Sequence, residues 1–268
     1  MSTSSAMRAV IVKDVTAVRR SKAIVLPMLI VPFLLLVVLP VFIGLAAKTV
    51  HSTSVVSFMQ NLPHSVARPI LDLPPREQLV VLVLGYLLAP LFLIVPLMLS
   101  SVLAADAFAG EKERRTLETM LLLPIGDGPL FYAKVLAAFL PAMAISWIGF
   151  ILYAVVANSV GWSATHRIFV PTSLWLVVIF WVGPAVAALG LGVMVRVSAR
   201  ARTAQEANQL GGAVILPLIF VAVGQSAGLL LVTVPIALGI GAGLWLIAVW
   251  LVVRGGRRFT RDRIAERL

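Results

Sequence analysis

Ionisable residues of both signs gather in one segment, residues 106–134, which reads DAFAGEKERRTLETMLLLPIGDGPLFYAK. Five of the chain's 11 acidic residues lie there with four basic ones: Asp106, Glu111, Glu113, Glu118 and Asp127 with Lys112, Arg114, Arg115 and Lys134. Glu111 to Arg115 and Arg114 to Glu118 are spacings of four residues, which place opposite charges on one exposed helix face. Such a segment can form ion pairs with a protein partner, whereas a lipid-binding loop would be mostly basic. The simpler alternative is a solvated loop whose charge pairs only stabilise its own helix.

The pattern predicts that this segment contains a short amphipathic helix held between two apolar runs. Gly110 interrupts the preceding run, so a new helix is expected there, with Glu111 and Glu113 in its first turn, where negative charge is favourable. Its apolar face is formed by Leu117, Met120 and Leu121. Pro124 is expected to end the helix.

The composition identifies what surrounds this segment. The chain has 268 residues, of which 60% are hydrophobic and only 12% are charged, and its mean hydropathy is +1.04. These values exclude an ordinary soluble domain and predict an all-α, multi-pass membrane protein. The net charge of +11 could suggest nucleic acid, but the basic residues lie beside apolar runs, which is a pattern of membrane topology. The absence of Cys excludes disulfides and thiolate metal sites.

A single transmembrane domain is expected over residues 1–268, with six spans. They are expected at about 23–47, 79–105, 135–157, 169–195, 210–224 and 234–253. Pro90 and Pro96 should kink the second span, and Trp162 and Trp175 should lie near the membrane interfaces. Residues 158–168 are expected to form a short loop, and residues 225–233 a re-entrant turn.

The two ends of the chain are both basic. Residues 1–22 repeat apolar residues at helical spacing and predict a helix lying on the membrane surface, with Arg8, Lys13, Arg19 and Arg20 on its polar face. Residues 254–268 form an Arg-rich tail. Eighteen of the 22 basic residues fall on one side of the predicted topology, and only Lys48, Arg68, Arg76 and Arg167 on the other. This asymmetry places both termini and residues 106–134 in the cytoplasm, and the chain in the cytoplasmic membrane.

Several kinds of chemistry are disfavoured. The six predicted spans hold no Asp, Glu, Lys, Arg or His, which argues against an ion-coupled carrier and against an intramembrane enzyme. His51, His64 and His166 fall in predicted outward loops, where scattered surface histidines are commoner than a metal site. The sequence has no GxxxxGK[ST] motif, so if ATP drives this protein, ATP and Mg²⁺ are expected on another subunit.

Residues 108–138 carry a family resemblance. The core GEKERRTLE, residues 110–118, resembles the GEKERGTLE signature of type-2 ABC exporter permeases, with Arg115 in place of the usual Gly. A later block, SARARTAQEANQLGGAVILPL at 198–218, resembles the stretch between the fourth and fifth spans of that family.

The resemblance implies six spans, a second permease protomer, expected to be a second copy of this chain, and two separate ATPase subunits. It also implies that residues 6–22 form an interfacial helix and that a cytoplasmic coupling helix contacts the ATPase through Gly110, Glu111, Lys112, Glu113, Arg114, Arg115, Thr116, Leu117 and Glu118. Drug-like amphiphiles, lipids, peptides, polysaccharides and ions all remain open as substrates. A membrane scaffold or assembly factor with the same fold is the alternative, followed by a channel or secondary carrier.

Overall fold

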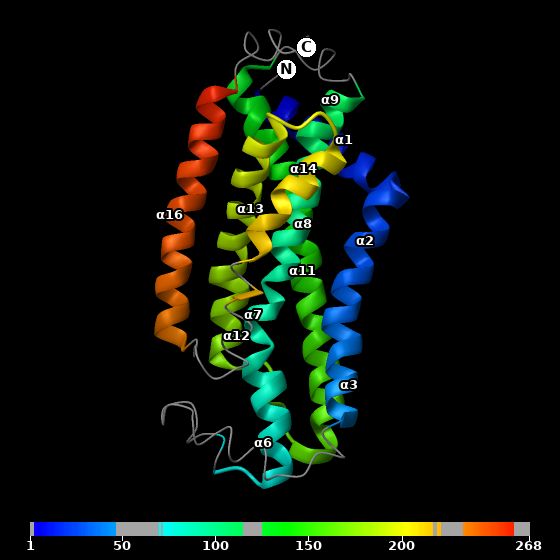
Figure 1. The fold of residues 1–268 in the computed structure, drawn as a ribbon, viewed down its shortest axis with the longest axis vertical. Helices are drawn as coiled ribbons and strands as arrows, with labels where there is room; N and C mark the ends of the chain where they lie inside the picture. The colour runs from blue at the N-terminus through cyan, green and yellow to red at the C-terminus, as the bar shows by residue number, and fades with distance from the viewer. Residues whose placement is uncertain are drawn as a thin grey trace.

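The structure is a computed structural model, and it describes residues 3–46, 70, 72–114, 125–216, 219–220 and 233–259. The described residues form helices joined by turns, so the expected all-helical class is confirmed (Figure 1). In chain order the helices are α1 (Thr3–Arg20), α2 (Lys22–Phe33), η1 (Leu34–Val38), α3 (Leu39–Ala46), α6 (Pro75–Leu82), η2 (Val83–Leu87), α7 (Ala89–Phe92), α8 (Ile94–Ala105), η3 (Asp106–Gly110), α9 (Glu111–Glu113), α11 (Asp127–Thr165), α12 (Ser173–Val177), η4 (Val178–Val182), α13 (Gly183–Ser198), α14 (Ala204–Gly211), η5 (Gly212–Ile215) and α16 (Val234–Arg258).

Among the described residues, five apolar rods are long enough to cross a membrane. They are Ile24–Ala46, Glu77–Glu113, Asp127–Thr165, Ser173–Ser198 and Val234–Arg257. They match the first, second, third, fourth and sixth expected spans, so the chain is a multi-pass membrane protein. The second and third rods have 37 and 39 residues, more than the ~20 residues that a bilayer core requires. Both therefore continue beyond the apolar core.

The fifth expected span, residues 210–224, falls largely outside the described residues, as does the expected re-entrant turn at 225–233. A helix is already present before the expected start at residue 210, because α14 begins at Ala204. Thr203 precedes the helix, and its hydroxyl accepts a hydrogen bond of 3.0 Å from the Glu206 amide. This N-cap explains the start of α14. The helix packs against α8 and α13.

The loop expected at residues 158–168 is wrong at its start, because α11 continues to Thr165. His166 then adopts a left-handed conformation with φ of 46° and ends the helix. Asn158 stays within the helix and binds the returning chain: its amide donates to the Val170 carbonyl at 2.7 Å, and its oxygen accepts from the Phe169 amide at 2.9 Å. Asn158, the first residue of the expected loop, therefore lies in the helix and holds the segment after it by hydrogen bonds.

The second rod contains two π-helical turns, η2 and η3. A π turn shifts backbone hydrogen bonds from the fourth to the fifth residue, so a carbonyl can become available to a side chain. At η2 the Leu84 carbonyl accepts from the Tyr153 hydroxyl at 2.5 Å and from the Trp175 indole at 3.3 Å. Trp175 is fully buried there, packed against protein. Its expected depth near a membrane interface stays a prediction.

Helix α13 lies at the centre of the bundle and packs against both α8 and α16 (Figure 1). Two of its glycines face these neighbours. A Cβ on Gly190 would lie 2.7 Å from Leu97 of α8, and a Cβ on Gly192 would lie 2.7 Å from Leu251 of α16. Without side chains, these positions let the helices approach closely, as small residues do in membrane bundles.

Helix α1 packs against the start of α11 at one end of the bundle. Val10 of α1 is buried in a small apolar cluster with Ile125, Leu130 and Ala133. The apolar face that the sequence suggested for the membrane surface is therefore used, at least at Val10, for contact with the protein. This contact brings the polar residues of α1 beside the charged end of the second rod.

Candidate functional site: a charge network at one end of the bundle

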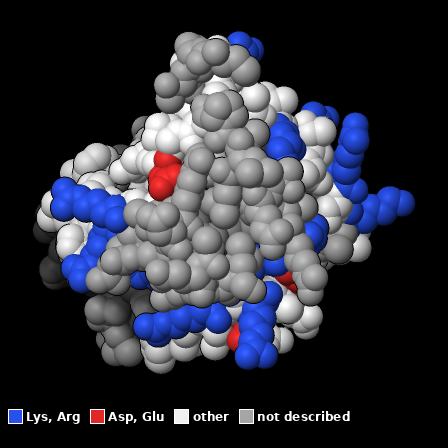
Figure 2. Space-filling model, turned by 90° about the horizontal axis from the view of Figure 1, so that it is seen from above, with Lys and Arg blue, Asp and Glu red and all other residues white. Residues whose placement is uncertain are grey.

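Helices α1, α9 and α14 and the first turns of α11 meet at the same end of the molecule (Figure 1). Seen from above, basic side chains stand at several points around this face and acidic ones at few (Figure 2). The expected helix start at Gly110 is wrong, because the second rod runs without interruption through η3 into α9. Glu111, Lys112 and Glu113 are thus part of the same helical rod as a membrane span.

Glu111 lies at the centre of this end and is almost completely buried, with 5% of its surface exposed. Its carboxylate accepts from the ammonium of Lys134 on α11 and, at 3.1 Å, from that of Lys13 on α1. Lys134 is 1% exposed. The exposed ladder position expected for Glu111 is therefore wrong: its carboxylate joins three helices inside the protein.

The backbone of η3 completes the surroundings of Lys134. The Ala107 carbonyl accepts a hydrogen bond of 2.9 Å from the Lys134 ammonium, and the Phe108 ring lies 5.7 Å from the same nitrogen. Burying a charge costs several kcal/mol unless it is paired and hydrogen-bonded. The carboxylate, the carbonyl and the ring supply that compensation together.

Asp14 gives the cluster a second negative charge. Its Oδ1 lies 3.3 Å from Lys13, whereas its Oδ2 is buried without a hydrogen-bond partner. Burial raises the pKa of Asp14, and the charge of Glu111 adds to this, although Lys134 and Lys13 act in the opposite direction. Burial also lowers the pKa of Lys13, but Glu111 and Asp14 outweigh it and leave that pKa raised. Lys13 accordingly stays charged beside the two carboxylates.

The next two residues tie α9 to the connection between α13 and α14. The Lys112 ammonium donates to the Ala201 carbonyl at 3.4 Å. The Glu113 carboxylate accepts at 3.0 Å from the amide of Ala204, the first residue of α14. A carboxylate at a helix N-terminus is favourable because it meets unpaired amides and the positive end of the helix dipole.

Gly110 leaves room for one more ion pair. Arg114 donates to Asp106 at 3.0 Å, and this hydrogen bond raises the pKa of Arg114. A Cβ on Gly110 would lie 2.8 Å from the Asp106 carboxylate and 3.1 Å from the Arg114 guanidinium. A glycine is therefore required for the pair to keep this geometry.

The structure brings together only part of the set expected from the sequence. Gly110, Glu111, Lys112, Glu113 and Arg114 lie in the network with Lys13, whereas Arg115, Thr116, Leu117 and Glu118 fall outside the described residues. Arg8, Arg19 and Arg20 are exposed on α1 and do not join it. Their expected place on a membrane surface stays a prediction.

Sequence reasoning missed Lys134, Asp14 and Asp106 as members of this network. The count of no ionisable residue in the spans depended on ending the second at residue 105 and starting the third at 135. In the structure Asp106, Glu111 and Lys134 all lie within the rods. Lys134 directly precedes the apolar run expected as the third span. This position was the available signal, because a charged residue so close to a span requires a partner of opposite charge.

Comparison with known families identifies the family of this chain. The family described as "ABC-2 family transporter protein" matches residues 8–252, which include the whole charge network. A search of curated proteins finds no match.

Proposed function

Because the chain belongs to the ABC-2 transporter family, we propose that it is the permease subunit of an ATP-driven exporter. In this proposal two copies of the chain form the pathway and two ATPase subunits bind beneath them. The sequence has no phosphate-binding motif of its own. ATP and Mg²⁺ would therefore bind to the partner, and this chain would convert their turnover into movement of its helices.

The observation that carries the proposal is the set of contacts made by residues 111–114. Glu111 contacts α1 and α11, Lys112 and Glu113 contact the start of α14, and Arg114 contacts η3. Glu111, Lys112 and Glu113 thus connect the second rod to α1, α11 and the start of α14, and Arg114 pairs with the second rod itself. A displacement at this point cannot stay local, because packed interiors move as bodies rather than deform continuously.

In the proposed mechanism the ATPase pushes on residues 115–118, which directly follow this network. The push reaches the second rod along its own backbone, the third rod through Lys134, and α1 through Lys13. The resemblance at residues 110–118 supports this as the coupling segment. The substrate class stays open.

The proposed orientation places the network and both termini in the cytoplasm, at the cytoplasmic membrane. The distribution of basic residues supports it. Single cysteines at two exposed positions test it cleanly, since the chain has none of its own. Ser163→Cys, near the end of α11, should react with an impermeant thiol reagent in intact cells, and Arg200→Cys, before α14, should react only after the cells are opened. The reverse pattern would refute the orientation.

The function is tested by reconstituting the chain into liposomes with and without its ATPase at matched ion gradients. Substrate-dependent stimulation of ATP hydrolysis and solute movement only with ATP and the second subunit would support the proposal. Movement driven by an ion gradient without the ATPase would indicate a carrier. Stable binding of the ATPase with neither stimulation nor transport across a panel of amphiphiles, polysaccharides and ions would indicate a scaffold.

A substitution outside the buried network tests the coupling segment. Glu118→Lys should weaken binding of the ATPase by at least tenfold, since like charges at an interface cost several kcal/mol. Asp72→Lys is the matched control, because Asp72 is an exposed acid just before α6 in the sequence, and α6 lies at the opposite end of the bundle (Figure 1). Equal ATPase binding by both variants would remove residue 118 from the contact. Glu111 does not suit this test, because its replacement disturbs the buried pair.

A further inference from the structure

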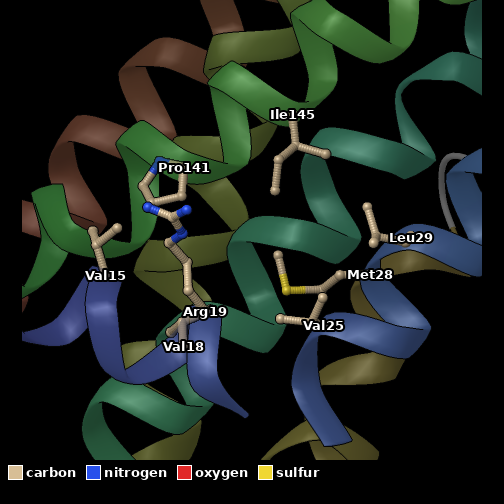
Figure 3. Close-up of a pocket in the computed structure, with 8 residues that line it drawn as sticks. All are labelled: Val15, Val18, Arg19, Val25, Met28, Leu29, Pro141 and Ile145. Carbon is tan, nitrogen blue, oxygen red and sulfur yellow. The ribbon is translucent and has the colours of Figure 1, made fainter. Parts of the chain in front are cut away.

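A groove lined by apolar side chains opens where α1 turns into α2 and both lie against α11 (Figure 3). Its volume is about 140 Å³. The lining residues come from all three helices: Val15, Val18 and Arg19 from α1, Val25, Met28 and Leu29 from α2, and Pro141 and Ile145 from α11. Seven of the eight are apolar, so the groove suits a hydrocarbon chain.

Arg19 is the one charged residue in this lining. Its side chain rises from α1 and ends beside Pro141, while Val25, Met28 and Leu29 lie across the opening (Figure 3). Arg20 and Lys22 follow at the turn between α1 and α2, and both are exposed. Within the part of the chain that the structure describes, none of these three cations has an acidic partner.

The groove lies where the first membrane span begins. The apolar rod starts at Ile24, so Arg19, Arg20 and Lys22 stand at the level of lipid headgroups, and Leu29 lies about one and a half turns further into the apolar layer. A cation at that level attracts anionic headgroups, and each such residue contributes about 1 kcal/mol to membrane attraction. Charge and apolar lining are therefore arranged in the same order as the headgroup and acyl chain of a phospholipid.

We propose that this groove is a binding site for one anionic phospholipid, whose acyl chain lies between α2 and α11 and whose phosphate is bound by Arg19. A zwitterionic lipid offers the same chain, but its added cation would face Arg19, Arg20 and Lys22. A free phosphate would leave the apolar wall exposed to water. The site concerns the lipid surroundings of the chain, so it stands whether or not the chain is an exporter.

A lipid in this position would act on the charge network through α1. Arg19 lies six residues after Lys13, which binds Glu111. An occupied groove would hold the end of α1 against α2 and α11. It would thereby restrict movement of the helix that carries Lys13.

Native mass spectrometry of the purified full-length chain tests the proposal, with phosphatidylglycerol and phosphatidylcholine of identical acyl chains as probes. The wild type should retain one phosphatidylglycerol at least tenfold more than phosphatidylcholine. Arg19→Gln should lose this preference, and Arg19→Lys should keep part of it. Arg8→Gln, the matched control on the same helix outside the groove, should retain it fully. Val25→Trp, which fills the groove, should reduce retention of both lipids.

Three kinds of result would overturn the proposal. The first is a lipid preference other than the one expected: either equal retention of the two lipids by the wild type or an unchanged preference in Arg19→Gln. The second is displacement of the lipid by millimolar glycerol phosphate, which would indicate a site for a soluble anion. The third is a disulfide between two copies carrying Val25→Cys, which would show that a second copy covers the groove. Matched elution profiles and melting temperatures would show that each variant is folded.

Discussion

The ammonium of Lys134 binds the carboxylate of Glu111 in the interior of the protein, across 23 positions of sequence. One residue lies in the eighth position of α11 and the other begins α9, at the end of a continuous 37-residue rod. The pair therefore joins the second and third rods at one end of the bundle. Lys13 adds a third helix to the same carboxylate.

Removal of one partner of this pair should be more harmful than removal of both. Lys134→Met leaves Glu111 buried with Lys13 alone, whose side chain is half exposed. It should destabilise the protein by about 3 kcal/mol, because a buried charge that loses its buried partner is costly. The double variant Lys134→Met with Glu111→Leu should recover at least half of that loss. Unfolding in detergent, followed by fluorescence, gives the double-mutant cycle.

The control for this cycle is Arg167→Gln. Arg167 forms an ion pair of 3.3 Å with Glu77, and its side chain is 51% exposed. Loss of such a pair should cost below about 1 kcal/mol. Equal losses for Lys134→Met and Arg167→Gln would contradict the buried role of Lys134.

Gly110→Ala should break the pair between Asp106 and Arg114 while the helix itself persists. An added methyl group would lie 2.8 Å from the Asp106 carboxylate and 3.1 Å from the Arg114 guanidinium, so at least one of these side chains must shift, although Ala is the better helix former. We expect ATPase-coupled turnover to fall several-fold with a melting temperature within about 3 °C of the wild type. Gly128→Ala is the control, since no atom lies within 4 Å of a Cβ there. Full coupling in Gly110→Ala would show that the pair is dispensable.

Asp14→Asn should remove a pH dependence of stability. Burial raises the pKa of Asp14 in the folded state above its ordinary value of 3.8. At any pH between 3.8 and the folded-state pKa, the folded state therefore binds more protons than the unfolded state. Stability contributed by the protonated group is therefore lost as the pH rises through the folded pKa. The groups that face Asp14 are Lys13, Glu111 and Lys134.

The measurement for Asp14 is the melting temperature of wild type and Asp14→Asn from pH 4 to pH 8. At neutral pH the variant should melt about 2 °C higher, and the difference should shrink toward pH 4. A variant that melts lower at neutral pH would mean that attraction by the two lysines outweighs the cost of burial.

Glu113→Ala should loosen the start of α14. The carboxylate accepts from the Ala204 amide, and a charge at a helix N-terminus contributes up to about 1 kcal/mol. Hydrogen exchange at the Ala204 amide should become about fivefold faster, the kinetic equivalent of that free energy. Glu113→Gln, which keeps an acceptor oxygen, should show a smaller change.

A second variant separates this contact from the local cap. Thr203→Ala removes the acceptor of the Glu206 amide, so exchange should accelerate at residue 206 more than at residue 204. Identical exchange patterns in the two variants would mean that α14 opens as a unit, independently of Glu113.

The sequence by itself determined the class of this protein and the position of its charged segment. A fraction of 60% hydrophobic residues in long uncharged runs predicts membrane helices. The charged segment was found because GEKERRTLE is a run of consecutive residues, which can be compared with a known motif without knowledge of the fold. The same locality explains the correct order of the five rods, since each follows from its own composition.

Tertiary structure decided which charges pair. The four-residue spacing from Glu111 to Arg115 predicts a contact along one helix, but it gives no sign that Glu111 binds Lys134 and Lys13, 23 and 98 positions away. Helix packing excludes water from Glu111, and a buried carboxylate requires the nearest available cations, whichever element carries them. For the same reason Trp175 is buried in the protein, where its indole donates a hydrogen bond to the Leu84 carbonyl of a π turn. Spacing along a chain gives the partners within one helix, whereas partners between helices depend on how those helices pack.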